Sequence, residues 1–241
     1  MKIALAQVNP TVGDLEGNAE RLCRAYEKAA TAGADLVVAP ELSLCGYPPR
    51  DLLLKRGFVD RNLAALDNLS ESIGEVGLIV GHVGRNSIRP GREATNAATL
   101  LHKGRVHATR SKTLLPTYDV FDEDRYFEPA RENTPVTFRG RQLGVTICED
   151  VWNDEGYWRD RRYDRNPVNK LVGAGAEVIL NLSASPWHLG KERMRREMLE
   201  TLAKTIQLPL FYCNATGGND ELIFDGGSLA FDSAGQLLVR G

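Results

Sequence analysis

The sequence predicts an α/β fold with mixed strand directions and helices packed outside the strands. Short apolar runs alternate with helix-like stretches along most of the 241 residues, an order that is typical of α/β proteins. Three pairs of apolar runs are separated by short turns and predict β-hairpins, which add antiparallel strands. No Pro/Ser-rich linker and no shift in composition divides the chain. We therefore expect one domain over residues 1–241.

The first elements can be bounded from their end signals. KIALAQV at 2–8 predicts a strand, and Asn18 is the expected N-cap of a helix in which apolar residues recur at helical spacing. Gly33 is expected to end this helix. DLVVAP at 35–40 is apolar without interruption, which is typical of a strand covered on both faces.

The remaining elements are predicted from the same patterns of apolar spacing and turn residues. In order, they are a helix near 59–73, a strand at 77–84, a hairpin at 95–112 that turns near Lys103 and Gly104, a hairpin at 135–148 that turns near Gly140, a strand at 177–183, an amphipathic helix at 190–206, a strand at 208–214 and a closing hairpin at 228–239.

Composition and charge argue against several classes of protein. The chain has 30 Lys+Arg and 32 Asp+Glu, a net charge of −2, so it lacks the basic excess of a nucleic-acid-binding protein. No apolar run approaches the roughly 20 residues that cross a bilayer, and the N-terminus has no signal-peptide pattern. We expect a cytoplasmic protein without a nucleic-acid or membrane partner.

The cysteines give no sign of a disulfide framework or a metal site. They lie far apart and form no C-x-x-C pair: Cys23, Cys45, Cys148 and Cys213. Without a secretory signal, such cysteines are expected to be free thiols in a reducing compartment. We therefore expect no bound metal.

Polar side chains follow several predicted strands at the point where each strand ends. Glu41 follows DLVVAP, Cys148 follows GVTI, and Ser185 follows the strand at 177–183. In open α/β sheets, ligands collect beyond the carboxyl ends of strands. Lys112 ends the second strand of the first hairpin and precedes an aromatic, acidic loop.

Together, a Glu, a Lys and a Cys form a coherent set for cleaving an amide. Only the thiolate of a cysteine attacks, and a neighbouring ammonium group favours it. A carboxylate within hydrogen-bond reach can take the thiol proton and later pass it on. Lys112 and the backbone N–H after Cys148 could then stabilise the developing oxyanion.

Five blocks, in order along the chain, resemble the nitrilase (carbon–nitrogen hydrolase) superfamily, and more closely the glutaminase domain of glutamine-dependent NAD(+) synthetase. They are PELSLCGYPPRDLL, SKTLLPTYDVFDEDRYF, GVTICEDVW, NLSASPWHLGK and GGNDELIFDGGSLAF, and the resemblance runs from Ala4 to about Phe231. It implies a four-layer αββα sandwich with mixed β-sheets that forms homo-oligomers.

The same resemblance implies roles for individual residues. Glu41 matches the general base and acid of the family, Lys112 its catalytic lysine and Cys148 its nucleophile. Three further residues match positions that bind glutamine: Tyr118 in LPTYDVF, Ser185 in SASPWH and Lys191 in HLGK.

Two more carboxylates are possible supporting residues. Glu123 in FDEDRYF matches an extra glutamate near the lysine, although an ion pair with Arg125 that pins the loop is an equally open interpretation. Glu149 directly follows Cys148. A second carboxylate facing the thiolate would oppose its formation, so we expect the Glu149 side chain to point away.

The activity implied is hydrolysis of glutamine through a cysteine thioester, which releases ammonia for NAD(+) synthesis from deamido-NAD(+). This half requires no cofactor. ATP and Mg are implied only for an ATP-pyrophosphatase synthetase domain, the expected partner, whose S-G-G-x-D-S loop does not occur here. The chain is thus expected to be a truncated or separately encoded glutaminase half. The segment 151–171 is longer and more charged than the family pattern.

Three alternatives remain open at this point. A stand-alone nitrilase-family amidase would act on another small amide, and a non-catalytic nitrilase-like scaffold would need neither the Cys nor the Lys. A protease-like pairing of Cys148 with a histidine would use His188, the one histidine that lies in a matching block.

Overall fold

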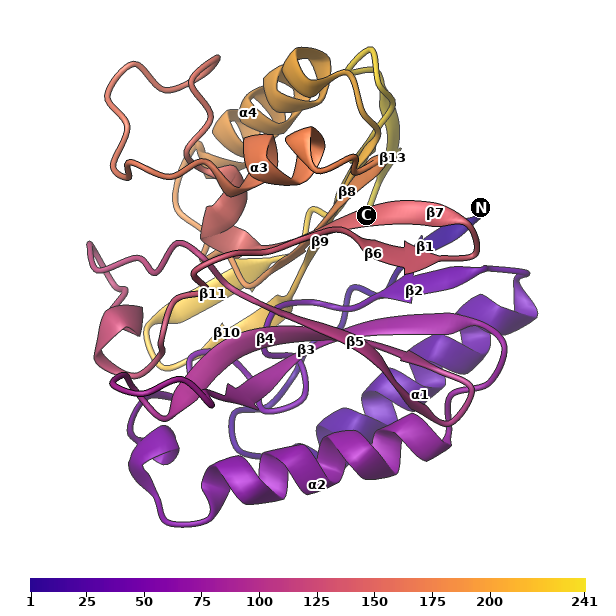
Figure 1. Cartoon of the computed structure of the whole chain (residues 1–241), viewed down its shortest axis with the longest axis vertical. Helices are drawn as coiled ribbons and strands as arrows, with labels where there is room; N and C mark the ends of the chain where they lie inside the picture. Colours follow the sequence, from indigo (N-terminus) through magenta and orange to yellow (C-terminus); the bar gives the residue numbers. More distant parts are fainter.

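Two β-sheets stacked face to face form the centre of the molecule, and helices cover both outer faces (Figure 1). The computed structural model describes residues 1–241. One outer layer holds α1 (Leu15–Thr31) and α2 (Phe58–Glu71), and the other holds α3 (Pro167–Gly173) and α4 (Lys191–Ile206). The predicted α/β class and the four-layer αββα arrangement are confirmed.

The first sheet has five strands in sequence order. They are β1 (Ile3–Leu5), β2 (Leu36–Val38), β3 (Gly77–Arg85), β4 (Ala94–His102) and β5 (Arg105–Ser111). The first three run parallel, whereas β3–β4 and β4–β5 are antiparallel. Lys103 and Gly104, both with positive φ, form the turn of the predicted hairpin.

The second sheet has six strands in the order β13-β12-β9-β8-β7-β6. They are β6 (Val136–Phe138), β7 (Arg141–Ile147), β8 (Val178–Ser183), β9 (Leu210–Asn214), β12 (Leu229–Phe231) and β13 (Leu237–Arg240). Strands β7, β8 and β9 are parallel, and hairpins flank them on both sides. Their carboxyl ends therefore meet at one edge of the sheet.

Several short elements had no clear signal in the sequence. Strand β10 (Thr216–Asn219) pairs with β11 (Leu222–Asp225), but its sequence TGGN has no apolar residue to mark a strand. Short 3-10 helices, which lack a full period of apolar spacing, form at Arg50–Leu54, Glu123–Arg125 and Cys148–Val151.

The prediction that Asn18 caps the first helix is wrong. Helix α1 starts one turn earlier, and its N-cap is Asp14, whose side chain accepts a hydrogen bond from the Gly17 N–H. Asn18 is buried inside the helix, where its amide donates to the carbonyls of Thr11 and Leu44. Its polar side chain therefore holds a neighbouring loop.

The burial of β2 explains its uninterrupted apolar sequence. Leu36 and Val38 face the second sheet and belong to the core between the two sheets. Val37 faces the opposite way and packs in the cluster under α1 and α2. All three are fully buried. No helix in the structure combines the length and apolar character required to cross a membrane.

Candidate active site

The predicted catalytic residues lie where strands of the two facing sheets end. Glu41 follows β2 and Lys112 follows β5 in the first sheet, whereas Cys148 follows β7 in the second. All three are almost fully buried. The structure brings Glu41 and Lys112 together although they are 71 residues apart in the sequence, and Cys148 lies close enough to both for their charges to shift the pKa of its thiol.

Lys112 forms a buried ion pair with Glu41. The Lys112 Nζ lies 2.7 Å from Oε1 of Glu41, which also accepts a hydrogen bond of 2.7 Å from the Asn96 amide. The other carboxylate oxygen, Oε2, accepts from the backbone N–H of Ala184 at 3.0 Å. These three donors fix the orientation of the Glu41 carboxylate.

Glu123 holds Lys112 from the other side. Its Oε1 and Oε2 lie 2.7 and 2.9 Å from the Lys112 Nζ, and the Tyr47 hydroxyl donates to Oε1 at 2.9 Å. The alternative ion pair with Arg125 does not form, since Arg125 lies 3.8 Å from Asp51 instead. Of the two interpretations of Glu123, the structure agrees with the one that places it beside the lysine.

The pKa values of Lys112 and Glu123 depend on burial and on the neighbouring charges of this cluster. Burial alone would lower the pKa of Lys112, but Glu123 and Glu41 outweigh it and hold this pKa well above its usual value. Burial raises the pKa of Glu123, against the lowering effect of Lys112. One ammonium thus lies between two carboxylates.

Cys148 is a neutral thiol in this environment. Burial and the Glu41 carboxylate raise the pKa of the thiol, although Lys112 and a hydrogen bond with Ser183 act to lower it. The sequence suggests that a nearby ammonium would favour the thiolate, but here two carboxylates already balance the Lys112 charge. Attack by sulfur therefore requires a base that takes the proton during the reaction.

The backbone bends sharply at Cys148, which has a φ of 41°. This region is unfavourable for a residue with a side chain, at a cost of about 1–3 kcal/mol. Asp150 holds the bend: its Oδ2 accepts from the Ile147 N–H at 3.0 Å, and its Oδ1 accepts from Thr113 and Leu114 at 3.0 and 2.8 Å. One buried carboxylate thereby ties the Cys148 bend to the segment after Lys112.

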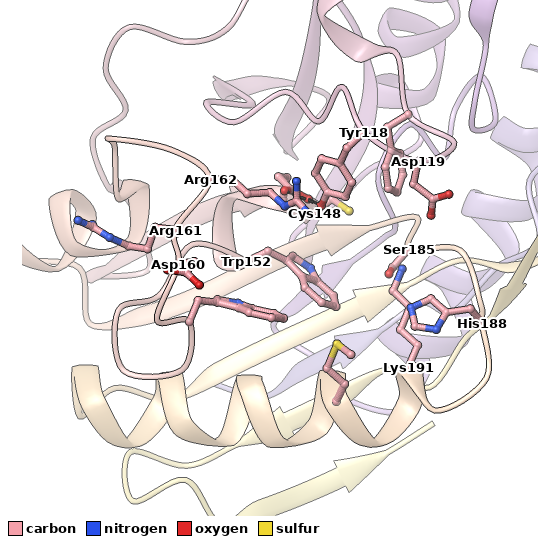
Figure 2. A pocket seen from close by; sticks show the side chains of 14 residues that line it. Tyr118, Asp119, Cys148, Trp152, Asp160, Arg161, Arg162, Ser185, His188 and Lys191 are labelled. Atoms are coloured by element: carbon pink, nitrogen blue, oxygen red, sulfur yellow. Dashed lines mark hydrogen bonds between the residues drawn. The ribbon is translucent and has the colours of Figure 1, made fainter.

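A cavity of about 240 Å³ opens in front of Cys148 (Figure 2). The three residues predicted to bind glutamine, Tyr118, Ser185 and Lys191, all line it. In Figure 2, Tyr118 lies beside Cys148, whereas Ser185 and Lys191 form a second group with His188. The cavity is large enough for a small molecule, and the predicted binding residues are brought to it.

The expectation that Glu149 points away from the site is wrong. Glu149 lines the same cavity as Cys148 and is almost fully buried. The Tyr118 hydroxyl donates to its two oxygens at 2.8 and 3.0 Å, and the Tyr163 hydroxyl donates at 3.1 Å. These hydrogen bonds compensate for the burial of the Glu149 carboxylate beside the thiol. An argument from charge repulsion alone does not include them.

The charged segment 151–171 forms one wall of the cavity. Trp152, Trp158 and Arg162 line it, and the Arg162 guanidinium lies 3.9 Å from the centre of the Tyr118 ring. The Lys191 ammonium lies 5.4 Å from the centre of the Trp152 ring. This charged segment thus contributes directly to the site.

His188 does not pair with Cys148. It lines the cavity from an exposed turn, and its Nδ1 lies 3.2 Å from the neighbouring Leu189 carbonyl. No hydrogen bond joins its ring to the thiol, so the protease-like alternative has no support in the geometry. The structure also places no group of three or more His, Cys, Asp or Glu side chains where they could hold a metal ion.

Sequence reasoning missed several residues that shape the site. Tyr47 lies in CGYPPRD and Asp150 in GVTICEDVW, inside two of the blocks that resemble the family. Their place in these blocks is the signal that could have identified them. Asn96 lies within β4 and Tyr163 in the charged segment. Neither has a local pattern that separates it from an ordinary strand or loop residue.

Comparisons with known proteins identify the family to which the chain belongs. A profile of the family described as carbon–nitrogen hydrolase matches residues 2–241. The glutamine-dependent NAD(+) synthetases of Synechocystis sp. and Thermotoga maritima are 45% and 39% identical to the chain over 242 residues. These matches cover 99% and 100% of the chain but only 43% and 40% of the relatives. The chain therefore spans about two fifths of the length of these curated relatives.

Solved structures share the fold of this chain. The glutamine-dependent NAD(+) synthetase of Acinetobacter baumannii, in complex with ADP, superposes with a TM-score of 0.89 at 31% identity, over 99% of this chain and 43% of that one. An amidase from Nesterenkonia sp. superposes with a TM-score of 0.81 at 26% identity, over 100% of this chain and 86% of that one.

Proposed function

Because this chain belongs to the carbon–nitrogen hydrolase family, we propose that it hydrolyses the side-chain amide of glutamine and releases ammonia. Its fold is shared with amidases of the nitrilase superfamily. The observation that carries the proposal is the buried Glu41–Lys112–Glu123 cluster near the Cys148 thiol. Cys148 itself lines a cavity that also holds charged side chains of both signs.

Thioester formation is the first half of the proposed reaction. As the Cys148 sulfur bonds to the amide carbon, Glu41 takes the thiol proton, and the carbonyl oxygen gains a negative charge. Lys112 has three N–H groups, so one can serve this oxyanion together with the Glu149 backbone N–H. Glu41 then protonates the nitrogen, the carbon–nitrogen bond breaks and ammonia leaves.

Hydrolysis of the thioester is the second half. Glu41, again a carboxylate, takes a proton from water as the water oxygen attacks the thioester carbon. The carbon–sulfur bond breaks, the proton returns to sulfur and glutamate is released. Glu123 and Asn96 act as positioning residues, because they hold Lys112 and Glu41 in place through all of these steps.

The charges of the cavity suit an amino acid rather than a neutral amide. Lys191 and Arg162 can hold an α-carboxylate, and the Glu149 carboxylate can hold an α-ammonium group. Tyr118 and Ser185 provide polar contacts between these charges and Cys148. An uncharged amide would offer no opposite charge to Glu149 or Lys191, so it would gain less from binding than an amino acid.

We place this activity in the context of the relatives named as NAD(+) synthetases. Residues 1–241 would be one glutaminase domain in the cytoplasm that supplies ammonia to a synthetase domain for NAD(+) synthesis from deamido-NAD(+). ATP and Mg would be used by that partner domain, and the glutaminase chemistry needs neither. Formation of a homo-oligomer belongs to the same proposal.

A general amidase is the second candidate function. It is favoured by the superposition on the Nesterenkonia amidase, of which the chain covers 86%. The two candidates differ in whether the charged end of the substrate is recognised.

Ammonia release from glutamine, asparagine and propionamide tests the proposal. We expect glutamine to be preferred by about 100-fold or more in kcat/KM, since one well-matched buried charge contact is typically worth 10-fold or more. In the Lys191→Met variant, kcat/KM should fall for glutamine and stay unchanged for propionamide. Lys204→Met, on the exposed side of the same helix, is the matched control. Equal turnover of glutamine and propionamide would establish the general amidase instead.

A further inference from the structure

The side chain of Tyr163, in the charged segment 151–171, contacts the Glu149 carboxylate. The Tyr163 hydroxyl lies 3.1 Å from Oε1 of Glu149, and the Tyr118 hydroxyl lies 2.8 and 3.0 Å from Oε1 and Oε2. A carboxylate only accepts and each phenol carries one proton, so both tyrosines donate. Two hydroxyls from separate loops thus hold one carboxylate in the wall of the cavity.

A buried amide fixes the backbone of Tyr163. Asn153 is 2% exposed. Its Nδ2 donates to the carbonyls of Tyr163 and Arg165 at 2.9 and 2.7 Å, and its Oδ1 accepts from the Tyr163 N–H at 3.4 Å. These contacts close residues 153–165 into a loop. Tyr163 is therefore anchored through its backbone as well as through its contact with Glu149.

Glu149 is a buried carboxylate without a cation. The residue is 4% exposed, its side chain accepts hydrogen bonds only from tyrosine hydroxyls, and no Lys, Arg or His forms an ion pair with it. Burial raises the pKa of Glu149, whereas the hydrogen bonds from Tyr118 and Tyr163 lower it and favour the ionised form. Because a buried charge is costly unless it is paired, the site suits a ligand that brings a positive charge.

The two hydroxyls use one oxygen of Glu149 more than the other. Oε1 accepts from both tyrosines, whereas Oε2 lies 3.0 Å from Tyr118 alone, whose single proton has the nearer Oε1 at 2.8 Å. A carboxylate offers about four lone-pair sites, so Oε2 can accept from an N–H group of a ligand. Without Tyr163, the carboxylate would be held from one side only and could rotate.

We propose that Tyr163 is a positioning residue that determines specificity for an α-amino group: together with Tyr118, it holds the Glu149 carboxylate so that Oε2 receives the α-ammonium group of the substrate. The inference deepens the proposed function and rests on it, since the substrate there is an amino acid. It assigns part of substrate recognition to the charged segment 151–171, in addition to the residues that follow the strands.

Titration of tryptophan fluorescence in the whole chain carrying Cys148→Ala tests the proposal, because Trp152 and Trp158 line the cavity and the substrate is not consumed. The two ligands are glutamine and 4-carbamoylbutanoate, which is glutamine without its α-amino group. Addition of Tyr163→Phe should raise the Kd for glutamine by about 10-fold, as for loss of a hydrogen bond to a charged group. The Kd for 4-carbamoylbutanoate should change by less than about twofold, because this ligand has no group for Glu149.

A purely structural role of Tyr163 predicts a different pattern, because a loosened segment would weaken the binding of both ligands alike. Tyr126→Phe is the matched control: its hydroxyl donates to the Asp51 carboxylate at 2.7 Å, outside the cavity, so both Kd values should stay unchanged. When Glu149→Gln is already present, Tyr163→Phe should have little further effect on the Kd for glutamine. An unchanged Kd for glutamine, equal weakening of both ligands, or a full effect in the presence of Glu149→Gln would overturn the proposal.

The outcome is separable from that of the proposed function. If Tyr163→Phe weakens the binding of glutamine alone but the parent chain releases no ammonia from glutamine, the role of Tyr163 stands and the proposed reaction fails. If the parent hydrolyses glutamine but Tyr163→Phe leaves its Kd unchanged, the role of Tyr163 alone is overturned. Absence of glutamine binding in the chain carrying only Cys148→Ala would overturn both.

Discussion

Oε1 of Glu41 lies 2.7 Å from Nζ of Lys112, and neither side chain is exposed to solvent. Glu41, the base of the proposed reaction, is therefore held in place by the Lys112 ammonium and not by water. The same ammonium also contacts Glu123. Because the carboxylates outnumber the ammonium, the resting thiol keeps its proton until substrate arrives. This arrangement yields predictions for each partner.

Replacement of Glu41 by Gln should lower kcat for glutamine by about 10²–10⁴-fold, the usual value of a general acid–base group. The two oxygens of Glu41 accept from Lys112, Asn96 and the Ala184 N–H, and an amide NH₂ cannot replace either oxygen. Steady-state kinetics measures the loss. Glu221→Gln, at an exposed carboxylate, is the control. A loss below about threefold would mean that Glu41 only caps its strand.

Replacement of Lys112 by Met should destabilise the fold as well as abolish activity. The change leaves Glu41 and Glu123 buried without a cation, at a cost of about 3–5 kcal/mol in the free energy of unfolding. The pKa values of such carboxyls rise above those of the unfolded chain, so the folded variant binds more protons and its deficit should shrink as pH falls.

Denaturant unfolding of Lys112→Met at several pH values measures this deficit. Addition of Glu123→Gln to Lys112→Met should recover part of it, because one buried charge is removed. Lys103→Met provides the comparison, since its ion pair with Glu75 is exposed and should be worth no more than about 1 kcal/mol. Equal effects of the two lysine substitutions would contradict the importance of the buried cluster.

Folding stability should depend on pH through His82. Burial lowers the pKa of His82 to about 4, although its hydrogen bond to the Val83 carbonyl raises it. The unfolded chain, with the usual value of 6.5, binds the proton first, so stability is lost as pH falls from about 6.5 towards 4, by up to about 3 kcal/mol. His82→Gln should have a flatter stability curve in this window. Parallel curves for parent and variant would contradict this assignment.

The strands and the reacting residues could be predicted because they share one signal. Each reacting residue lies at the end of a predicted strand: Glu41 follows DLVVAP, Lys112 ends the second strand of the first hairpin and Cys148 follows GVTI. The carboxyl ends of such strands meet. The face-to-face stacking of the two sheets is implied only by the resemblance to the family, because no local sequence pattern indicates it.

The protonation of the site and its supporting contacts could not be predicted in the same way. Glu149 was expected to avoid the thiol on grounds of charge, but the hydroxyls of Tyr118 and Tyr163 come from two separate loops. Likewise, Asn96 reaches Glu41 only because the long strand β4 passes beside it. Such contacts depend on how segments far apart in the sequence pack against one another. No local pattern in a single sequence reports which of these segments meet.

Glutamine hydrolysis by the purified chain, compared between the parent, Cys148→Ser and Cys23→Ser, tests the central claim most directly. Cys23 is a free thiol outside the cavity and serves as the matched control. We predict ammonia release by the parent and by Cys23→Ser, with a γ-glutamyl group on the Cys148 peptide after rapid quenching, and neither ammonia nor adduct in Cys148→Ser at an unchanged melting temperature. Ammonia release by Cys148→Ser at near the parent rate would contradict the account.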